Sequence, residues 1–145
     1  MNKLLLAYIS AFVLLASGGM VYVAFRPSSL LLIVVLKALG AGDALDALKS
    51  SLQGLEVPDF VVYSLPAALW SAAYILAMEA LWRGRGVSLG FRVVWVSLVP
   101  VMGVASELMQ AYGMLPGVFD WMDLMCYVLP FLVYTVYGFR CVQGK

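Results

Sequence analysis

The sequence has no histidine, little charge and only two cysteines, and each shortage excludes a class of protein. Charged residues make up 12 % of the 145 residues, about half of their share in a typical soluble domain. Without histidine the chain lacks the usual acid–base group at neutral pH, and a zinc hydrolase is excluded in practice. A formal net charge of +1 leaves no basic excess to bind nucleic acid. Cys126 and Cys141 lie 15 positions apart on one expected helix, and this separation of about 22 Å excludes a disulfide between them.

Apolar side chains are what the chain has in abundance. They form 64 % of the residues, and the mean hydropathy is +0.98. A single small core cannot hide so much apolar surface from water, so the expected solvent is a lipid bilayer. Within a bilayer the backbone must satisfy its own hydrogen bonds, which favours helices. We therefore expect an all-α fold, a polytopic membrane helix bundle that forms one domain over residues 1–145.

Four apolar stretches are long enough to cross the bilayer. A hydrocarbon core of about 30 Å needs about 20 residues of helix. The first stretch shares Lys3 and a run of small residues with signal peptides, but its apolar run continues to Phe25, so we interpret it as an uncleaved anchor. Each of the other three contains a proline, which predicts either ordinary bends or kinked helices that splay toward the outer leaflet and leave a polar-lined groove. The expected transmembrane helices cover residues 4–25, 60–82, 91–112 and 120–139.

The segment between the first two spans, residues 27–58, predicts short amphipathic helices at the membrane interface. An apolar run ends at Gly40 and Gly42, and Asp43 is then placed to cap a second helix. This second helix repeats leucine at roughly helical spacing, which suits an interfacial helix. The segment is expected to be a lid packed on the bundle, with a re-entrant or lipid-facing element as the alternative.

Lysine and arginine near the span ends predict the orientation. Six of them fall on the side that holds both termini and the loop between spans two and three, against three on the other side. The excess of positive charge marks the cytoplasmic side. The expected location is the bacterial inner membrane, with both termini cytoplasmic. The six residues are Lys3, Arg83, Arg85, Arg92, Arg140 and Lys145.

The second span carries one acid and a stripe of small residues. Glu79 precedes Arg83 by four positions, the favourable order for an ion pair on one helix. A structural ion pair near the interface is the expected role, and a proton or ion relay is the alternative. Small residues let helix backbones approach closely in lipid, and here they follow one face at Ser64, Ala68 and Ala72.

A group of polar residues surrounds the short connection between the last two spans. Glu107 and Gln110 are three residues apart and share a helix face, and Asp120 and Asp123 repeat that spacing on the next helix. The short turn between them predicts one shared polar site at the outer end. Such a cluster of acids with no neighbouring base must bind protons, a cation, or a cationic or hydroxyl-rich ligand, or else face water. We expect these four residues to bind a ligand; whether a metal is bound stays open, and no cofactor is expected.

The two aspartates also have a purely structural interpretation. Both stand at the start of the last span, where a negative charge stabilises the helix N-terminus. The same explanation fails for Glu107, because it stands near the C-terminal end of its helix, where negative charge is unfavourable. Glu107 is therefore the strongest single candidate for function, since polar groups at membrane depth are costly to keep.

These residues resemble the VanZ-like family of small bacterial membrane proteins. The resemblance covers Glu-x-x-Gln at the end of one span and Phe-Asp-x-x-Asp at the start of the next, in the last third of the chain. It implies an envelope protein, and the family's namesake is associated with low-level teicoplanin resistance. Three positions depart from the family pattern, which marks a divergent member. Gly117, Tyr127 and Pro130 stand where the family usually has Arg, Asn and Gly.

Three functions follow as hypotheses. The first is a VanZ-like membrane protein that binds a polar or lipid-linked envelope component at the acidic site, without catalysis. The second is a small structural subunit of a larger membrane assembly, in which the acids are caps or partner contacts. The third is a cation-dependent enzyme acting on a lipid headgroup, with Glu107 as base and the aspartates as metal ligands. The expected partners are membrane lipids and an envelope lipid or membrane protein, and an enzyme is the least favoured.

Overall fold

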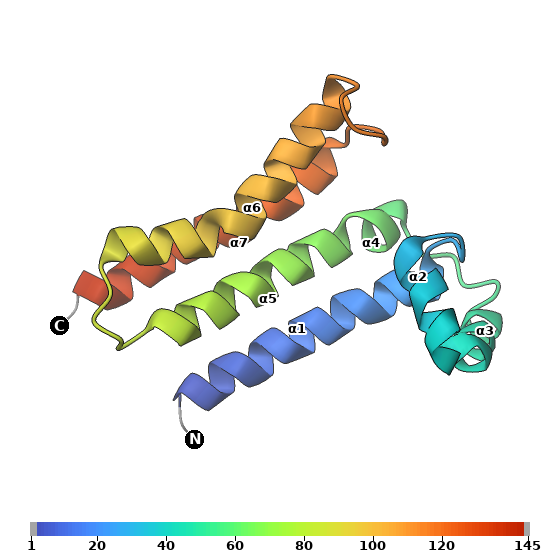
Figure 1. Cartoon of the computed structure of the whole chain (residues 1–145), viewed down its shortest axis with the longest axis horizontal. Coiled ribbons are helices and arrows are strands. Elements are labelled where there is room, and N and C mark those ends of the chain that lie inside the picture. Colours follow the sequence, from blue (N-terminus) through green and yellow to red (C-terminus); the bar gives the residue numbers. More distant parts are fainter. Residues whose placement is uncertain (1–2, 144–145) are drawn as a thin grey trace.

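The computed structural model describes residues 3–143, with side chains described as far as Tyr137, and every regular element in this range is a helix (Figure 1). The all-α prediction is therefore confirmed. Lys145 and the side chains of Arg140 and Cys141 lie outside the described part. In chain order the elements are α1 (Lys3–Phe25), α2 (Leu31–Leu36), the π-helical turn η1 (Lys37–Ala41), α3 (Gly42–Ser51), α4 (Asp59–Tyr63), α5 (Leu65–Trp82), α6 (Leu89–Ala111) and α7 (Trp121–Gln143).

Three of these helices, α1, α5 and α6, are long and apolar enough to cross a membrane. The part of α7 whose side chains are described, Trp121–Tyr137, is a shorter apolar helix, so a fourth span stays a prediction. Large apolar side chains such as Phe12, Val94 and Met102 are exposed on the outside of the bundle. A bilayer would cover this surface, as expected for a membrane protein.

The long helices lie side by side and have two distinct ends. At one end α1 begins, α5 ends and α6 begins, with Arg83 and Arg85 in the loop; we call this the arginine end (Figure 1). At the other end α6 runs into the connection to α7 that carries Asp120; we call this the acidic end. Helix α1 packs along α5, and α5 contacts both α6 and α7. The N-terminus and the α5–α6 loop, two of the three positively charged segments expected on one side of the membrane, therefore meet at one end of the bundle.

The second expected span is interrupted near its start. Residues 60–82 do not form one helix, because α4 ends at Tyr63 and α5 begins at Leu65, with Pro66 in its first turn. Proline has no N–H, and its ring collides with the carbonyl group four residues earlier, so it fits without cost only in the first turn of a helix and bends a helix elsewhere. Pro100 and Pro130, in contrast, lie inside α6 and α7.

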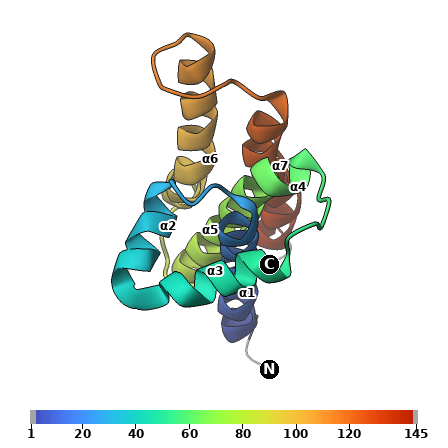
Figure 2. The ribbon, with the colours of Figure 1, turned by 90° about the vertical axis from the view of Figure 1, so that its right-hand side faces the viewer.

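The interfacial segment forms an arm at the acidic end of α1, where α3 contacts that helix (Figure 2). Gly40 interrupts its helices with a φ of 91°, a conformation that glycine adopts without strain. The prediction that Asp43 caps α3 is wrong: the N-cap is Ala41, without a side-chain hydrogen bond, and Asp43 lies inside the first turn. Lys49 ties the arm down, since its ammonium group donates to the Arg26 carbonyl oxygen at 2.7 Å and to Ser28 Oγ at 2.9 Å.

A close approach at Gly18 joins α1 to α5. A Cβ atom on Gly18 would lie 2.6 Å from Nε1 of Trp70. The same indole nitrogen donates to the Leu15 carbonyl oxygen at 3.3 Å, and the ring lies 5.4 Å from that of Tyr22. The indole thus occupies the space that a side chain at position 18 would need.

We expect Gly18→Ala to destabilise the bundle by about 1–2 kcal/mol, because the added methyl group displaces the Trp70 ring from a packed seam. The neighbouring Gly19 is the matched control, since a Cβ atom there meets nothing within 4 Å. Gly19→Ala should leave stability unchanged or raise it, because alanine favours helix more than glycine. Thermal unfolding of both variants in detergent measures the difference. Equal melting temperatures would show that the Trp70 ring yields without cost.

Candidate functional site

The acidic end contains a buried carboxylate, Glu107, on the last turns of α6. Only 5 % of the surface of Glu107 is exposed. Its Oε2 accepts a hydrogen bond from the backbone N–H of Asp120 at 3.3 Å, so it reaches across to the first residues before α7. The described residues place no lysine or arginine in an ion pair with Glu107, since the three ion pairs among them involve Asp46 and Glu79.

The two aspartates near Glu107 occupy different environments. Asp120 is the N-cap of α7: its Oδ1 accepts from the backbone N–H of Met122 at 2.8 Å, as the capping interpretation predicted. Asp123 lies one turn further along, and its Oδ1 is buried with no hydrogen-bond partner among the described residues. The charges of both aspartates act on Glu107. The structure thus brings three of the four predicted residues together at one end of the α6–α7 seam.

Gln110, the fourth predicted residue, makes no hydrogen bond to the acids in the described part of the chain. Its Nε2 donates to Ser106 Oγ over a long 3.5 Å. Its side chain fills the space beside Gly117, where a Cβ atom would lie 2.6 Å from Gln110 Oε1. Gly117 also has a φ of 140°, which disfavours other residues. The position that usually carries arginine in the VanZ-like family therefore has no room for a side chain while Gln110 stays in place.

Tyr127 borders the acidic cluster and was missed as a site residue from the sequence. A Cβ atom on Gly103 would lie 2.3 Å from Tyr127 Cδ1, so the ring covers Gly103. The tyrosine also lies within electrostatic reach of Glu107 and Asp123. The signal was present in the spacing: Gly103 stands four residues before Glu107, and Tyr127 four residues after Asp123, one helical turn from each acid on facing helices.

No three Asp, Glu or Cys side chains in the described part of the chain are grouped so that they could hold a metal ion. Cys126 is a free, buried thiol on α7. The acids at the α6–α7 seam are thus a concentration of negative charge around one buried carboxylate.

A second polar cluster lies at the arginine end, around Glu79. The expected pair with Arg83 is present, with Arg83 Nε 3.2 Å from Glu79 Oε1. Two further partners come from other helices: a guanidinium nitrogen of Arg92 on α6 also bonds Oε1, and the Tyr134 hydroxyl on α7 donates to Oε2 at 2.9 Å. Only 9 % of the Glu79 side chain is exposed. Glu79 therefore joins three helices instead of forming a simple surface pair.

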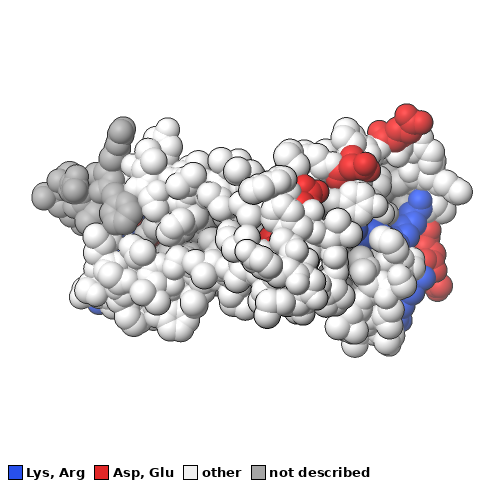
Figure 3. Space-filling model, turned by 90° about the horizontal axis from the view of Figure 1, so that it is seen from above, with Lys and Arg blue, Asp and Glu red and all other residues white. Residues whose placement is uncertain are grey.

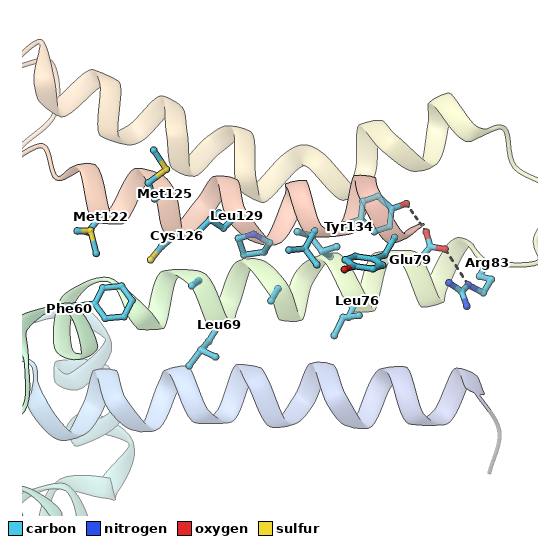
Figure 4. A pocket seen from close by; sticks show the side chains of 16 residues that line it. Phe60, Leu69, Leu76, Glu79, Arg83, Met122, Met125, Cys126, Leu129 and Tyr134 are labelled. Carbon is cyan, nitrogen blue, oxygen red and sulfur yellow. Dashed lines mark hydrogen bonds and ion pairs between the residues drawn. The ribbon is translucent and has the colours of Figure 1, made fainter. Parts of the chain in front are cut away.

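A long apolar groove runs between α5 and α7, and we call it the α5–α7 groove (Figure 4). Its volume is about 760 Å³. Phe60 and Met122 line one end, and Glu79, Arg83 and Tyr134 line the other. Ala68 and Ala72 of the predicted small-residue stripe face this groove, whereas Ser64 of the stripe is buried. The α5–α7 groove is lined mainly by apolar side chains, so it is not the polar-lined groove that splayed, proline-kinked helices are expected to leave.

Comparison with known proteins gives no match: no family model matches the chain, and no curated protein or solved structure is significantly similar to it. The resemblance to the VanZ-like family rests on the motif residues at the acidic end. What the structure adds is their placement in space, with three of the four gathered around one α6–α7 seam.

Proposed function

We propose that this protein is a VanZ-like membrane protein of the bacterial envelope that binds a cationic or hydroxyl-rich part of an envelope component at Glu107 and Asp123, without catalysis. In this proposal α7 is the fourth span, both termini lie in the cytoplasm of an inner-membrane protein, and the acidic end faces outward. The component is a lipid or a lipid-linked molecule, because the site stands at the end of a bundle with an apolar outer surface.

The observation that carries the proposal is the contrast between the two buried glutamates. Glu79 has two arginines and a tyrosine hydroxyl as partners. Glu107 is equally buried, but in the described part its carboxylate accepts only one long hydrogen bond, from the backbone N–H of Asp120. A buried carboxylate oxygen of Asp123 has no hydrogen-bond partner there. A buried charge without compensation costs several kcal/mol. A ligand that brings positive charge or hydrogen-bond donors would supply what Glu107 and Asp123 lack.

The second candidate, a structural subunit of a larger assembly, is favoured by Asp120. Its carboxylate already caps α7, so this acid has a role that needs no ligand. The two candidates differ in what Glu107 and Asp123 do, and substitutions at these positions separate them.

The test compares the lipids that copurify with the protein from bacterial membranes. We expect the wild type to enrich a component with a cationic or hydroxyl-rich headgroup, and Glu107→Gln and Asp123→Asn each to lower this enrichment about tenfold, because a charge-assisted hydrogen bond is lost. Asp120→Asn is the matched control, since asparagine still caps a helix. Extraction of the purified protein followed by mass spectrometry measures the enrichment.

All variants are compared at equal membrane abundance and helix content, which separates loss of ligand from loss of fold. An unchanged lipid profile in Glu107→Gln contradicts the proposal. If that variant instead keeps a copurifying membrane protein that the wild type also carries, the structural-subunit function is supported.

A further inference from the structure

The α5–α7 groove changes character along its length. Most of its lining is aliphatic, aromatic or sulfur-containing, and only at the arginine end does it meet charged side chains (Figure 4). A smaller pocket, of about 410 Å³, lies at the same end, between the start of α1 and the last turns of α5. Leu76, Glu79 and Arg83 line both the groove and the pocket, and Lys3 lines the pocket. The arginine end of the α5–α7 groove thus adjoins a smaller pocket that shares its charged residues.

Positive charge is in excess at this terminus. Glu79 is the only acid that lines the groove or the pocket, and it already bonds the guanidinium group of Arg92, whose side chain is 13 % exposed. Arg83 reaches Glu79 only through Nε, and its side chain remains 56 % exposed. In the described part of the chain no other hydrogen bond is made by the Arg83 side chain. Its terminal nitrogens and the Lys3 ammonium group therefore offer donors to an anion.

Aromatic rings show where this terminus lies relative to a bilayer. Trp82 meets Phe91 at a ring-centroid distance of 5.0 Å and Trp95 at 6.2 Å, next to Arg83 along the chain. Tryptophan and other aromatic side chains gather at the level of the lipid headgroups. The guanidinium group of Arg83 then stands at the depth of the lipid phosphates, while the α5–α7 groove below it lies at the depth of the acyl chains. In contrast to this charged end, the middle of the bundle has almost no charged side chains on the face that Figure 3 shows.

We propose that the α5–α7 groove is a binding site for one anionic phospholipid, whose phosphate is bound by Arg83 and Lys3 and whose acyl chain lies along the groove. The positive charge at the arginine end indicates which kind of molecule occupies the groove. Among the described residues that line the groove or the pocket the only acid is Glu79, which is already paired, so the uncompensated charge is positive, and the apolar lining of the rest of the α5–α7 groove suits an acyl chain better than an acidic segment of a second copy. A phosphate diester matches an exposed guanidinium group through charge-assisted hydrogen bonds. This site is separate from the acidic end and does not depend on the function proposed there.

The test titrates the purified full-length protein with phosphatidylglycerol or with phosphatidylcholine of the same acyl chains, and counts bound lipid by native mass spectrometry. Both lipids carry a phosphate diester, but the choline ammonium group of phosphatidylcholine is repelled by Arg83 and Lys3, so we expect phosphatidylglycerol to bind about tenfold more tightly. Arg83→Gln should remove this preference. Arg85→Gln is the matched control, because Arg85 belongs to the same loop and lines neither the groove nor the pocket.

A second variant tests the groove itself. Ala72→Phe fills the groove near its middle and should weaken binding of both lipids, whereas Met102→Phe, on the exposed surface of α6 outside the groove, should weaken neither. Equal affinity for the two lipids in the wild type would overturn the proposal, as would equal effects of Arg83→Gln and Arg85→Gln. A dimer that Ala72→Phe dissociates would assign the groove to a second copy instead.

Discussion

Replacing Glu79 by glutamine is expected to destabilise the bundle by about 3–5 kcal/mol, the usual effect of removing one partner of a buried ion pair. The loss of stability is this large because Arg92 keeps its charge when the carboxylate of Glu79 is removed. Only 13 % of the Arg92 side chain on α6 is exposed, its Nε already has no partner in the described part, and its bond to the Glu79 carboxylate is its ionic contact. In Glu79→Gln the guanidinium charge stays buried without a counter-charge. Reversible unfolding in detergent measures the loss.

Two controls separate the buried charge from the surface pair. Arg83→Gln removes the half-exposed partner and should change stability by less than about 1 kcal/mol, as exposed ion pairs do. Combining Glu79→Gln with Arg92→Met should be milder than the sum of the two single changes, because no unpaired charge then remains buried. Additive effects of Glu79→Gln and Arg92→Met would contradict this account. So would equal losses in Glu79→Gln and Arg83→Gln, which would mean that Glu79 is only a surface residue.

The positions of the long helices could be predicted because lipid imposes their length. The expected spans 4–25 and 91–112 agree closely with α1 (Lys3–Phe25) and α6 (Leu89–Ala111). Each is an apolar run with charged or turn-forming residues at its ends, and the thickness of a bilayer sets the number of residues between them. The short α6–α7 connection likewise required Glu107, Asp120 and Asp123 to lie at the same end of the bundle, as they do.

The partners of Glu79 could not be predicted in the same way. Pairing Glu79 with Arg83 needs only the spacing within one helix, whereas Arg92 and Tyr134 depend on how α6 and α7 are rotated about their own axes. In soluble proteins an apolar stripe fixes that rotation, but here every face of the helices is apolar. The rotation of each helix is instead set by the positions at which small side chains let two helices approach closely. For the same reason Gln110 shares its helix with Glu107 but turns toward Gly117.

At Gly103 the close contact between α6 and α7 fixes how the two helices are rotated about their own axes. We expect Gly103→Ala to destabilise the bundle by about 2–3 kcal/mol. The three atoms nearest to an added Cβ all belong to the Tyr127 ring, at 2.3–2.5 Å, so the ring must move or the helices must separate. The ring also borders Glu107 and Asp123, so the acidic site should be disturbed together with the seam. Unfolding in detergent measures the first effect, and the lipid enrichment assigned to Glu107 measures the second.

Gly90, on the same helix, is the matched control, because a Cβ atom there meets nothing within 4 Å. Gly90→Ala should therefore keep both stability and lipid enrichment. Combining Gly103→Ala with Tyr127→Ala creates space for the methyl group, although it also removes the packing of the ring. The double variant should therefore be less destabilised than the sum of the two single changes, because residues in contact are not additive. Full additivity would show that Gly103 and Tyr127 do not meet, and the seam that brings Glu107 toward Asp123 would then have a different rotation.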